Sequence, residues 1–202
     1  MIKAIFFDFD GVLTNFEYGS YTVCYNLSQK TGIPTDKLVS CYHQHTGGLD
    51  IGKIEDKDFW GAFCRCVGCE IGITLLDYAF RNVSMNEKML ELAKKLRKNY
   101  KVGIITDNSK GRFNAIIDEF KLRDIFDALI LSADVGATKK EEVIFRRALD
   151  SLKLKPQECI FIDNSARNLE VPKRMGFKTI HYDFQKKDFD SLLTQLKTLI
   201  RI

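Results

Sequence analysis

The fold is decided by the stretch Ile5-Phe6-Phe7-Asp8-Phe9-Asp10-Gly11, close to the start of the 202-residue sequence. Its apolar residues predict a buried strand, and two acidic residues follow two positions apart where that strand ends. Two like charges at the end of a buried strand destabilise a fold unless a cation or a proton relieves their repulsion. The stretch therefore indicates a strand that carries chemistry, and not only a piece of the core.

Strands and helices alternate through the C-terminal 120 residues or so. Apolar runs predict strands at 101–105, 128–131, 159–162 and 178–181, after a first strand at 2–7. Helical spacing predicts helices at 84–99, 109–120, 141–152, 168–176 and 188–199, the first of them opened by a capping box of Ser84 and Glu87. Strands that alternate with helices of this length form βαβ units. We therefore predict an α/β fold, a three-layer Rossmann-like parallel sheet with helices on both faces.

No convincing strand pattern lies between the first predicted strand and the second. Helical spacing at 21–30, 35–42, 56–66 and 75–80 is punctuated there by glycine-rich turns. We interpret residues 18–81 as a small helical cap inserted after the first strand. Residues 1–17 and 82–202 then form the core.

Polar residues gather just past the carboxyl ends of the predicted strands. An open α/β sheet binds its ligands at that edge. The candidates there are Asp8, Asp10, Thr106, Asp107, Lys139, Asp163 and Asn164.

The same segments resemble the four motifs of the haloacid dehalogenase-like superfamily. Residues 6–14 resemble its first motif, 104–108 the second, 132–139 the third and 161–168 the fourth. The inserted helices are similar to the type C1 cap of that superfamily. Residues 163–176 and 47–60 resemble its sugar-phosphate phosphatases and the phosphatase domain of soluble epoxide hydrolases.

This resemblance implies a Mg²⁺-dependent phosphatase that works through an aspartyl-phosphate on a small phosphorylated metabolite. The branch that it resembles points to a sugar phosphate as the substrate. Asp8 would be the nucleophile, and Asp10 the general acid and base. Thr106 and Lys139 would bind the phosphoryl group and stabilise its charge. The metal ligands would be Asp8, the backbone carbonyl of Asp10, Asp163 and Asn164.

Three positions depart from the motifs. Asp107 stands where the family often has Asn, and we expect its carboxylate to turn away so that only its backbone N–H meets the substrate. Asn164 replaces a frequent second acid, which would weaken metal binding. Lys140 follows Lys139 where many relatives have Pro, and it is the alternative candidate for the role of Lys139 at the phosphoryl group.

The cap would contact the part of the substrate that carries no phosphate. Asn15 near the hinge, with His43, His45 and Gly47 between two cap helices, are the candidate contacts. The alternative is a plain helix–helix turn with solvated histidines.

Two other functions stay open. One is phosphoryl transfer of the phosphomutase type, because the sequence does not show whether water is excluded. The other is a non-catalytic phosphate-binding or interaction protein, which Asp107 and Asn164 keep possible.

Composition excludes several other classes. The net charge of +4 comes from 31 basic and 27 acidic residues spread along the chain. This is not the concentrated basic charge expected of a nucleic-acid-binding protein. No apolar stretch approaches the ~20 residues of a membrane helix, and no secretory signal is recognisable, so we expect a cytoplasmic protein. We expect it to be a monomer or a weak homodimer. The six cysteines are then expected as reduced thiols, without a zinc site at Cys64, Cys66 and Cys69.

Overall fold

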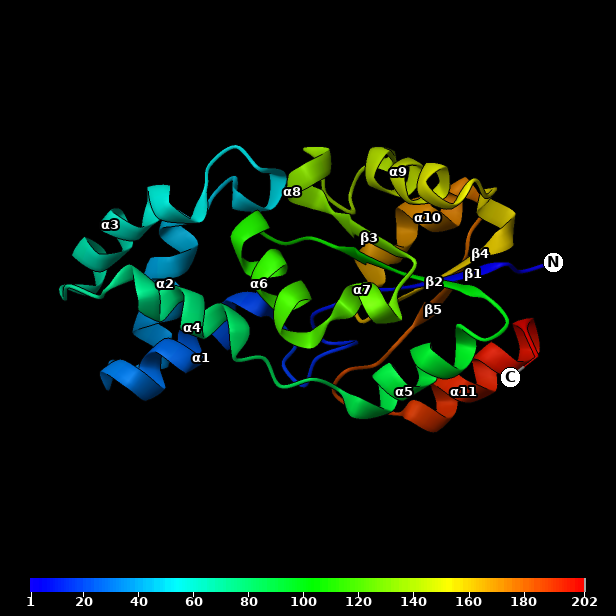
Figure 1. Ribbon diagram of the computed structural model, residues 1–202, viewed down its shortest axis with the longest axis horizontal. Helices are drawn as coiled ribbons and strands as arrows, with labels where there is room; N and C mark the ends of the chain where they lie inside the picture. The colour runs from blue at the N-terminus through cyan, green and yellow to red at the C-terminus, as the bar shows by residue number, and fades with distance from the viewer. Residues whose placement is uncertain (202) are drawn as a thin grey trace.

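All the strands lie parallel in one sheet, in the order β3-β2-β1-β4-β5 (Figure 1). The structure, a computed structural model, describes residues 1–201. The strands are β1 (Ala4–Phe7), β2 (Lys101–Thr106), β3 (Ala128–Leu131), β4 (Cys159–Asp163) and β5 (Lys178–His181). Ala4 pairs with both Lys101 and Cys159, so the first strand of the chain lies at the centre of the sheet. The predicted parallel α/β sheet is confirmed.

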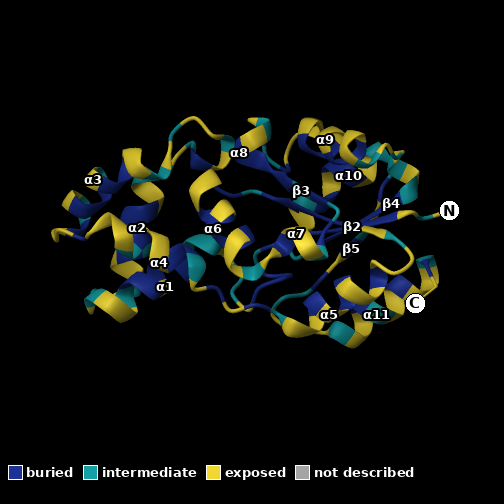
Figure 2. Ribbon diagram, in the orientation of Figure 1, coloured by how far each residue is buried: buried dark blue, intermediate teal, exposed yellow. Residues whose placement is uncertain are grey.

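Alternating side chains of the strands build a separate core on each face of the sheet. Phe6 and Phe161 point to one face, where Phe145 of α9 packs edge-on against Phe161 with ring centroids 5.5 Å apart. Phe7 and Ile104 point to the other face. The central strands β1 and β4 are buried along their whole length (Figure 2), as expected of parallel strands that run as continuous apolar segments, whereas the edge strand β5 exposes Lys178 and His181.

Helices cover both faces and complete the three layers. From residue 87 onward the helices are α5 (Glu87–Leu96), α6 (Lys110–Phe120), α7 (Leu122–Ile125), α8 (Ser132–Val135), α9 (Glu142–Leu152), α10 (Glu170–Met175) and α11 (Phe189–Leu199). α9 and α10 contribute to the core on the Phe6 face, and α5, α6 and α11 to the core on the Phe7 face. Both faces of the sheet are therefore covered, and its carboxyl end faces the remaining helices (Figure 1).

Those remaining helices form what we call the four-helix segment, residues 19–81. They are α1 (Gly19–Thr31), α2 (Thr35–His45), α3 (Asp56–Val67) and α4 (Ile73–Arg81), with a short 3₁₀ helix, η1 (Leu49–Ile51), between α2 and α3. The segment has its own apolar core, in which Trp60 and Phe63 stack and the Trp60 indole N–H donates to the Ile71 carbonyl. It packs on the sheet-bearing part through α6, which contacts α3 and α4.

The two connections to the four-helix segment lie side by side. Thr14 and Met85 form an antiparallel bridge, and the Asn15 side chain donates to Ser84 Oγ and to the Met85 carbonyl. Because Ser84 is engaged there, the predicted start of the next helix is wrong. α5 begins at Glu87, and Asn86 caps it by accepting from the Met89 N–H.

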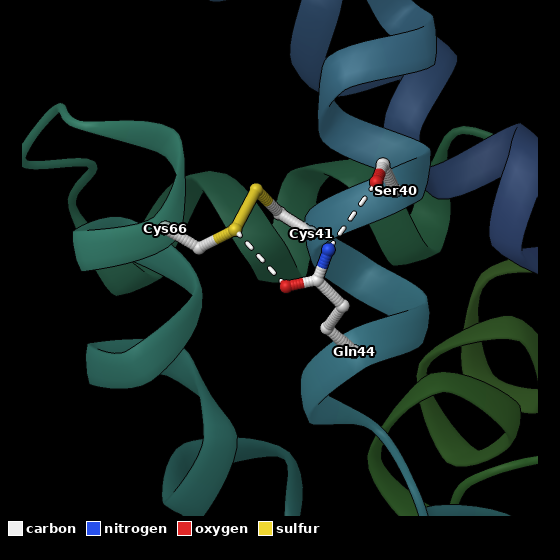
Figure 3. The surroundings of a disulfide bond; sticks show 4 residues. All are labelled: Ser40, Cys41, Gln44 and Cys66. Carbon is white, nitrogen blue, oxygen red and sulfur yellow. Dashed lines mark hydrogen bonds between the residues drawn. A yellow bond between two sulfur atoms is a disulfide. The ribbon is translucent and has the colours of Figure 1, made fainter.

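A disulfide joins Cys41 of α2 to Cys66 of α3 (Figure 3). The expectation of six reduced thiols is therefore wrong for this pair. The packing of α2 against α3 brings the two Cα atoms to 5.7 Å, within the range that a disulfide spans, and sequence spacing does not reveal such a meeting. Gln44 lies beside the bond, with its side-chain oxygen 3.8 Å from Cys66 Sγ.

Within residues 1–201, no helix is long and apolar enough to cross a membrane.

Candidate active site at the carboxyl end of the sheet

The Lys139 ammonium bridges two buried carboxylates at the carboxyl end of the sheet. It lies 2.7 Å from Asp8 Oδ1, just past β1, and 2.9 Å from Asp163 Oδ2, at the end of β4. The side chain of Lys139 is 3% exposed, that of Asp8 8% and that of Asp163 0%. β1 and β4 are neighbours from which the chain winds in opposite directions, and this is where open α/β sheets bind ligands.

Electrostatics at this cluster follow from its burial. Burial, together with repulsion from Asp163, raises the pKa of Asp8, while Lys139 acts in the opposite direction. Burial works to lower the pKa of Lys139, but the carboxylates of Asp8, Asp163 and Asp107 raise it by more, so the lysine stays charged. The cluster keeps one fixed positive charge between two acids, and a further cation would favour the ionised form of Asp8.

Three groups form a candidate cation site: the Asp8 carboxylate, the Asp10 carbonyl and the Asn164 side-chain amide. The Asn164 side-chain amide faces Asp8 Oδ2 at 3.3 Å and the Asp10 carbonyl at 3.1 Å. In the orientation that satisfies its hydrogen bonds, the amide NH₂ donates to both of these oxygens; rotated, the amide would place its own oxygen beside them.

With its oxygen turned inward, the Asn164 amide would join Asp8 and the Asp10 carbonyl as oxygen ligands of the kind that Mg²⁺ takes. Magnesium–oxygen bonds of about 2.0–2.1 Å in an octahedron place neighbouring ligand oxygens about 2.9 Å apart, close to the separations seen here. Gly11 makes the approach possible, because a Cβ at this residue would lie 2.4 Å from Asn164 Nδ2. Within residues 1–201, no three His, Cys, Asp or Glu side chains are grouped to hold a metal, so the carbonyl and the amide are essential to this set.

Asp163 is held from several sides. Besides Lys139, its carboxylate accepts hydrogen bonds from the Ser165 N–H at 2.7 Å and from the Asn168 side chain at 3.2 Å. It is completely buried beneath the cavity described below. Asp163 is also a predicted metal ligand; in this structure both of its oxygens accept from these donors, and the carboxylate orients Lys139 and the following loop.

Thr106 and Asp107 end the neighbouring strand, β2. The Thr106 side chain is buried and lines the cavity. Asp107 Oδ1 accepts the backbone N–H of Lys139 at 3.0 Å, so this carboxylate fixes the lysine loop. Burial raises the pKa of Asp107, and Lys139 partly offsets that rise.

A cavity of about 540 Å³ opens over these residues, between the sheet and the four-helix segment. This volume suits a small metabolite. Of the predicted site residues, it is lined by Asp8, Asp10, Thr106, Asp107, Lys139, Asn164, His43 and Gly47. His43 pairs with Ser20 Oγ at 3.0 Å. Asn15 and His45 do not line the cavity; Asn15 instead ties the two connections together.

Arg112 was missed by the sequence analysis. It lies in the first turn of α6, its side chain is 3% exposed, and its two terminal nitrogens each lie 2.8 Å from one oxygen of Asp10. One signal could have found it, because Arg112 shares the buried face of its helix with Ile116, four residues on. Asp56 of the four-helix segment binds the start of the same helix, and no sequence pattern marks it for that contact.

A family model for the haloacid dehalogenase-like hydrolases matches residues 2–176. The chain belongs to this family. The resemblance seen in the four sequence motifs is thereby confirmed, and the site occupies the region to which those motifs map.

Curated relatives share the family at low identity. A D-ribitol-5-phosphate phosphatase from Bacteroides thetaiotaomicron is 28% identical, with 89% of this chain aligned to 91% of the relative. The bifunctional epoxide hydrolase 2 of Sus scrofa is also 28% identical over 97% of this chain. The chain spans 38% of that longer protein.

Solved structures share the fold. A haloacid dehalogenase family enzyme from Bacteroides thetaiotaomicron superposes with a TM-score of 0.78 at 24% identity, covering 95% of this chain and 98% of its own. A mutant of that enzyme, in complex with magnesium and inorganic phosphate, gives the same TM-score at 22% identity, covering 95% of this chain and 99% of its own.

Proposed function

We propose that this protein is a Mg²⁺-dependent phosphatase that acts on a small phosphomonoester through an aspartyl-phosphate on Asp8. One observation carries the proposal: Asp8 faces a polar cavity between the Lys139 ammonium and two further groups, the Asp10 carbonyl and the Asn164 amide, that can offer oxygen ligands to Mg²⁺. The phosphatase names of the relatives and the magnesium and phosphate bound by a structural neighbour support it.

The chemistry runs in two steps. An Asp8 carboxylate oxygen attacks phosphorus, the bond from phosphorus to the ester oxygen breaks, and Asp10 gives its proton to that leaving oxygen. Water then attacks phosphorus, Asp10 takes a proton from the water, and the bond between phosphorus and Asp8 breaks. Inorganic phosphate and an alcohol result, and both carboxyl groups return to their starting states.

The surrounding residues stabilise the charge on the phosphoryl group. Thr106 would donate its hydroxyl to a phosphoryl oxygen, and Lys139 would bind another while it stays paired with Asp8. Asp8, the Asp10 carbonyl and Asn164 would hold Mg²⁺, which when bound supplies positive charge to the phosphoryl oxygens.

The cavity favours a substrate whose leaving group is polyhydroxylated and uncharged, such as a sugar or polyol phosphate. Among its described lining residues, the Lys and Arg side chains are Lys139 and Arg112, and carboxylates already pair with both. Glu17 and Asp50 add negative charge, and they suit hydroxyl groups better than a second phosphate or a carboxylate. This charge balance favours hydrolysis of a monophosphate over a mutase reaction, which needs a bisphosphate.

We also propose that residues 18–81 act as a cap that contacts the leaving group. The four-helix segment supplies Ser20, His43, Thr46 and Asp50 to the cavity. Its two connections are clamped side by side at Asn15, as expected of a hinge.

Phosphate release tests the proposal. The purified protein is given p-nitrophenyl phosphate and a panel of sugar, polyol, phosphoglycerate and bisphosphate esters, with Mg²⁺ or with EDTA. We expect Mg²⁺-dependent release that Asp8→Asn abolishes, with uncharged polyol esters preferred over doubly anionic ones. Metal-independent release, or release that survives Asp8→Asn, would overturn the mechanism. A preference for bisphosphates or phosphoglycerate would overturn the substrate class alone.

A further inference from the structure

A second space of about 440 Å³ opens beside the cavity over Asp8. We call it the aromatic hollow, because four of its lining side chains are aromatic: Phe16, Tyr18, Tyr21 and Phe184. Glu17 and Tyr18 line both the hollow and the cavity, so the two spaces adjoin at these residues. A leaving group that is too large for the cavity can therefore extend into the hollow.

The aromatic side chains of the hollow do not build the folded cores. Within residues 1–201, none of the four belongs to the apolar core on either face of the sheet or to that of the four-helix segment. Tyr18 is 61% exposed and Tyr21 41%. The ring of Tyr21 lies 5.9 Å from that of Phe16, measured between centroids, so the two form one aromatic surface. A group of aromatic side chains kept at the surface indicates a place where something binds.

Hydrogen bonds fix this surface relative to the catalytic residues. The Thr14 hydroxyl accepts from the Gly11 N–H at 3.0 Å and donates to the Phe16 carbonyl at 2.8 Å. Phe16 is thereby held a short, fixed length of chain beyond Asp10. Ligand sites are usually formed before their ligand arrives, and this tight turn meets that condition.

One carboxylate joins the two segments that line the hollow. Glu17 accepts from the Tyr18 hydroxyl at 2.9 Å and from the Gln185 side chain at 3.0 Å. Gln185 lies next to Phe184, in the turn that follows β5. The aromatic side chains from the start of the chain and from its end are therefore held around one space, at the boundary with the cavity.

The charges of the hollow favour an uncharged ligand. Among its described lining residues, the ionised side chains are Glu17 and Lys187, which carry opposite charges. The Lys187 ammonium already lies 5.5 Å from the centre of the Phe184 ring, and Glu17 already accepts two hydrogen bonds. A carboxylate has about four lone-pair sites, so Glu17 can still accept from an N–H or O–H at the edge of a ligand. The exposed rings favour a flat partner that stacks on them.

We propose that the aromatic hollow is a subsite for an uncharged aromatic ring that the leaving group carries beyond its phosphorylated sugar. A nucleoside monophosphate and an aryl glycoside phosphate both have this chemistry. The phosphorylated sugar occupies the cavity over Asp8, and the ring packs against the aromatic side chains of the hollow. The inference rests on the proposed function, because it takes the ester bound at Asp8 as the molecule that reaches the hollow.

Esters with and without the ring test the subsite. Adenosine 5′-monophosphate is compared with ribose 5-phosphate, and phenyl β-glucoside 6-phosphate with glucose 6-phosphate. Trehalose 6-phosphate, whose second ring is a sugar, is compared with glucose 6-phosphate as well. Stacking one ring on aromatic side chains strengthens binding by about 5–150-fold. We expect a rise of that order in kcat/KM, mainly through KM, for the ring-bearing ester of at least one aromatic pair, and the pair that gains identifies the source of the ring.

Two variants remove aromatic surface without changing the cavity. Tyr21 and Phe184 line the hollow but do not line the cavity. Tyr21→Ala and Phe184→Ala should each remove a large part of the advantage of the ring-bearing ester and leave kcat/KM for the ester without the ring unchanged. Tyr78→Ala is the matched control, because this tyrosine of α4 is 38% exposed and lies outside the hollow. The ratio of kcat/KM for two esters does not depend on the fraction of protein that is folded.

Four results would overturn the inference. The first is equal kcat/KM for the esters with and without an aromatic ring, and the second is an advantage that survives both variants. The third is a gain by the trehalose ester equal to that of the phenyl glucoside ester, which would remove the preference for an aromatic ring. The fourth is a change of oligomeric state in sedimentation of Tyr21→Ala with no effect on the esters, which would assign the surface to a second copy of the chain.

Failure of the proposed function would look different. If the wild-type protein releases phosphate from none of these esters, the proposed function falls. The wild type then binds them without consuming them, so calorimetry judges the hollow directly. Tighter binding of a ring-bearing ester that Phe184→Ala abolishes would support the subsite, and equal binding with and without the ring would overturn it.

Discussion

Replacing Lys139 by methionine should lower the free energy of unfolding by a large amount, for an electrostatic reason. The change removes the ammonium between Asp8 and Asp163 and leaves two buried carboxylates facing each other. Breaking a buried ion pair by removing one partner destabilises a protein by about 3–5 kcal/mol. For a chain of this size that free energy corresponds to a fall in Tm of roughly 6–20 °C.

Thermal and urea unfolding in EDTA measure this loss. A second variant, Lys139→Met with Asp163→Asn, removes one of the two facing charges and should regain a large part of the stability. Lys140→Met is the matched control, because Lys140 is exposed and should change the free energy of unfolding by less than about 0.5 kcal/mol. A large loss of stability in Lys140→Met would indicate that Lys140, and not Lys139, pairs with the buried carboxylates.

The penalty should also depend on pH. Burial and Asp163 raise the pKa of Asp8, and Lys139 opposes that rise, so its removal raises this pKa further. The penalty concerns the ionised carboxylate; it is therefore full above the raised pKa and shrinks as the pH falls through it. A loss below about 1 kcal/mol at neutral pH, or a loss that stays constant into acid, would refute the reasoning.

Three further results are expected. Asp8→Asn should be more stable than the wild type at pH 7 without metal, since a carboxyl with a raised folded pKa loses stability as the pH rises; equal pH profiles would contradict this. Gly11→Ala should lose about 1–2 kcal/mol and bind Mg²⁺ about 10–100-fold more weakly by calorimetry, because φ is +79° and its Cβ would meet Asn164; unchanged affinity would argue against the metal site. Cys41→Ser opens a disulfide that spans 25 residues to Cys66, which should cost about 3.5 kcal/mol in urea unfolding, and a difference that persists in reducing agent would contradict that cause.

Local signals in the sequence predict most of the fold. The strands at 128–131 and 178–181 match their predicted bounds, and the helix predicted at 109–120 is α6, with Ser109 as its N-cap. The prediction fails where a polar side chain has a distant partner. Ser84 looks like a cap, but it binds Asn15, which comes much earlier in the chain.

In the candidate site, too, local signals predict some residues and distant contacts escape prediction. Asp8, Thr106 and Asp163 could be grouped in advance because parallel strands end at one edge of a sheet. The buried face of its helix could have singled out Arg112. Its pairing with Asp10, the Asp56 contact and the Cys41–Cys66 bond could not be foreseen, since each depends on how helices pack after the chain has folded. Helix packing is set by the shapes of many side chains, and no short motif records it.

The central place of β1 has a consequence for synthesis of the protein. The strand Ala4–Phe7 leaves the ribosome well before its partners Lys101–Thr106 and Cys159–Asp163 are made. Until then four apolar residues lack their sheet, and closing such long loops slows folding. Meanwhile the four-helix segment, whose core comes from its own residues apart from Ala115, has nearly all its contacts available. A nascent chain that ends before Lys101 thus carries a foldable helical unit beside an unpaired, aggregation-prone strand.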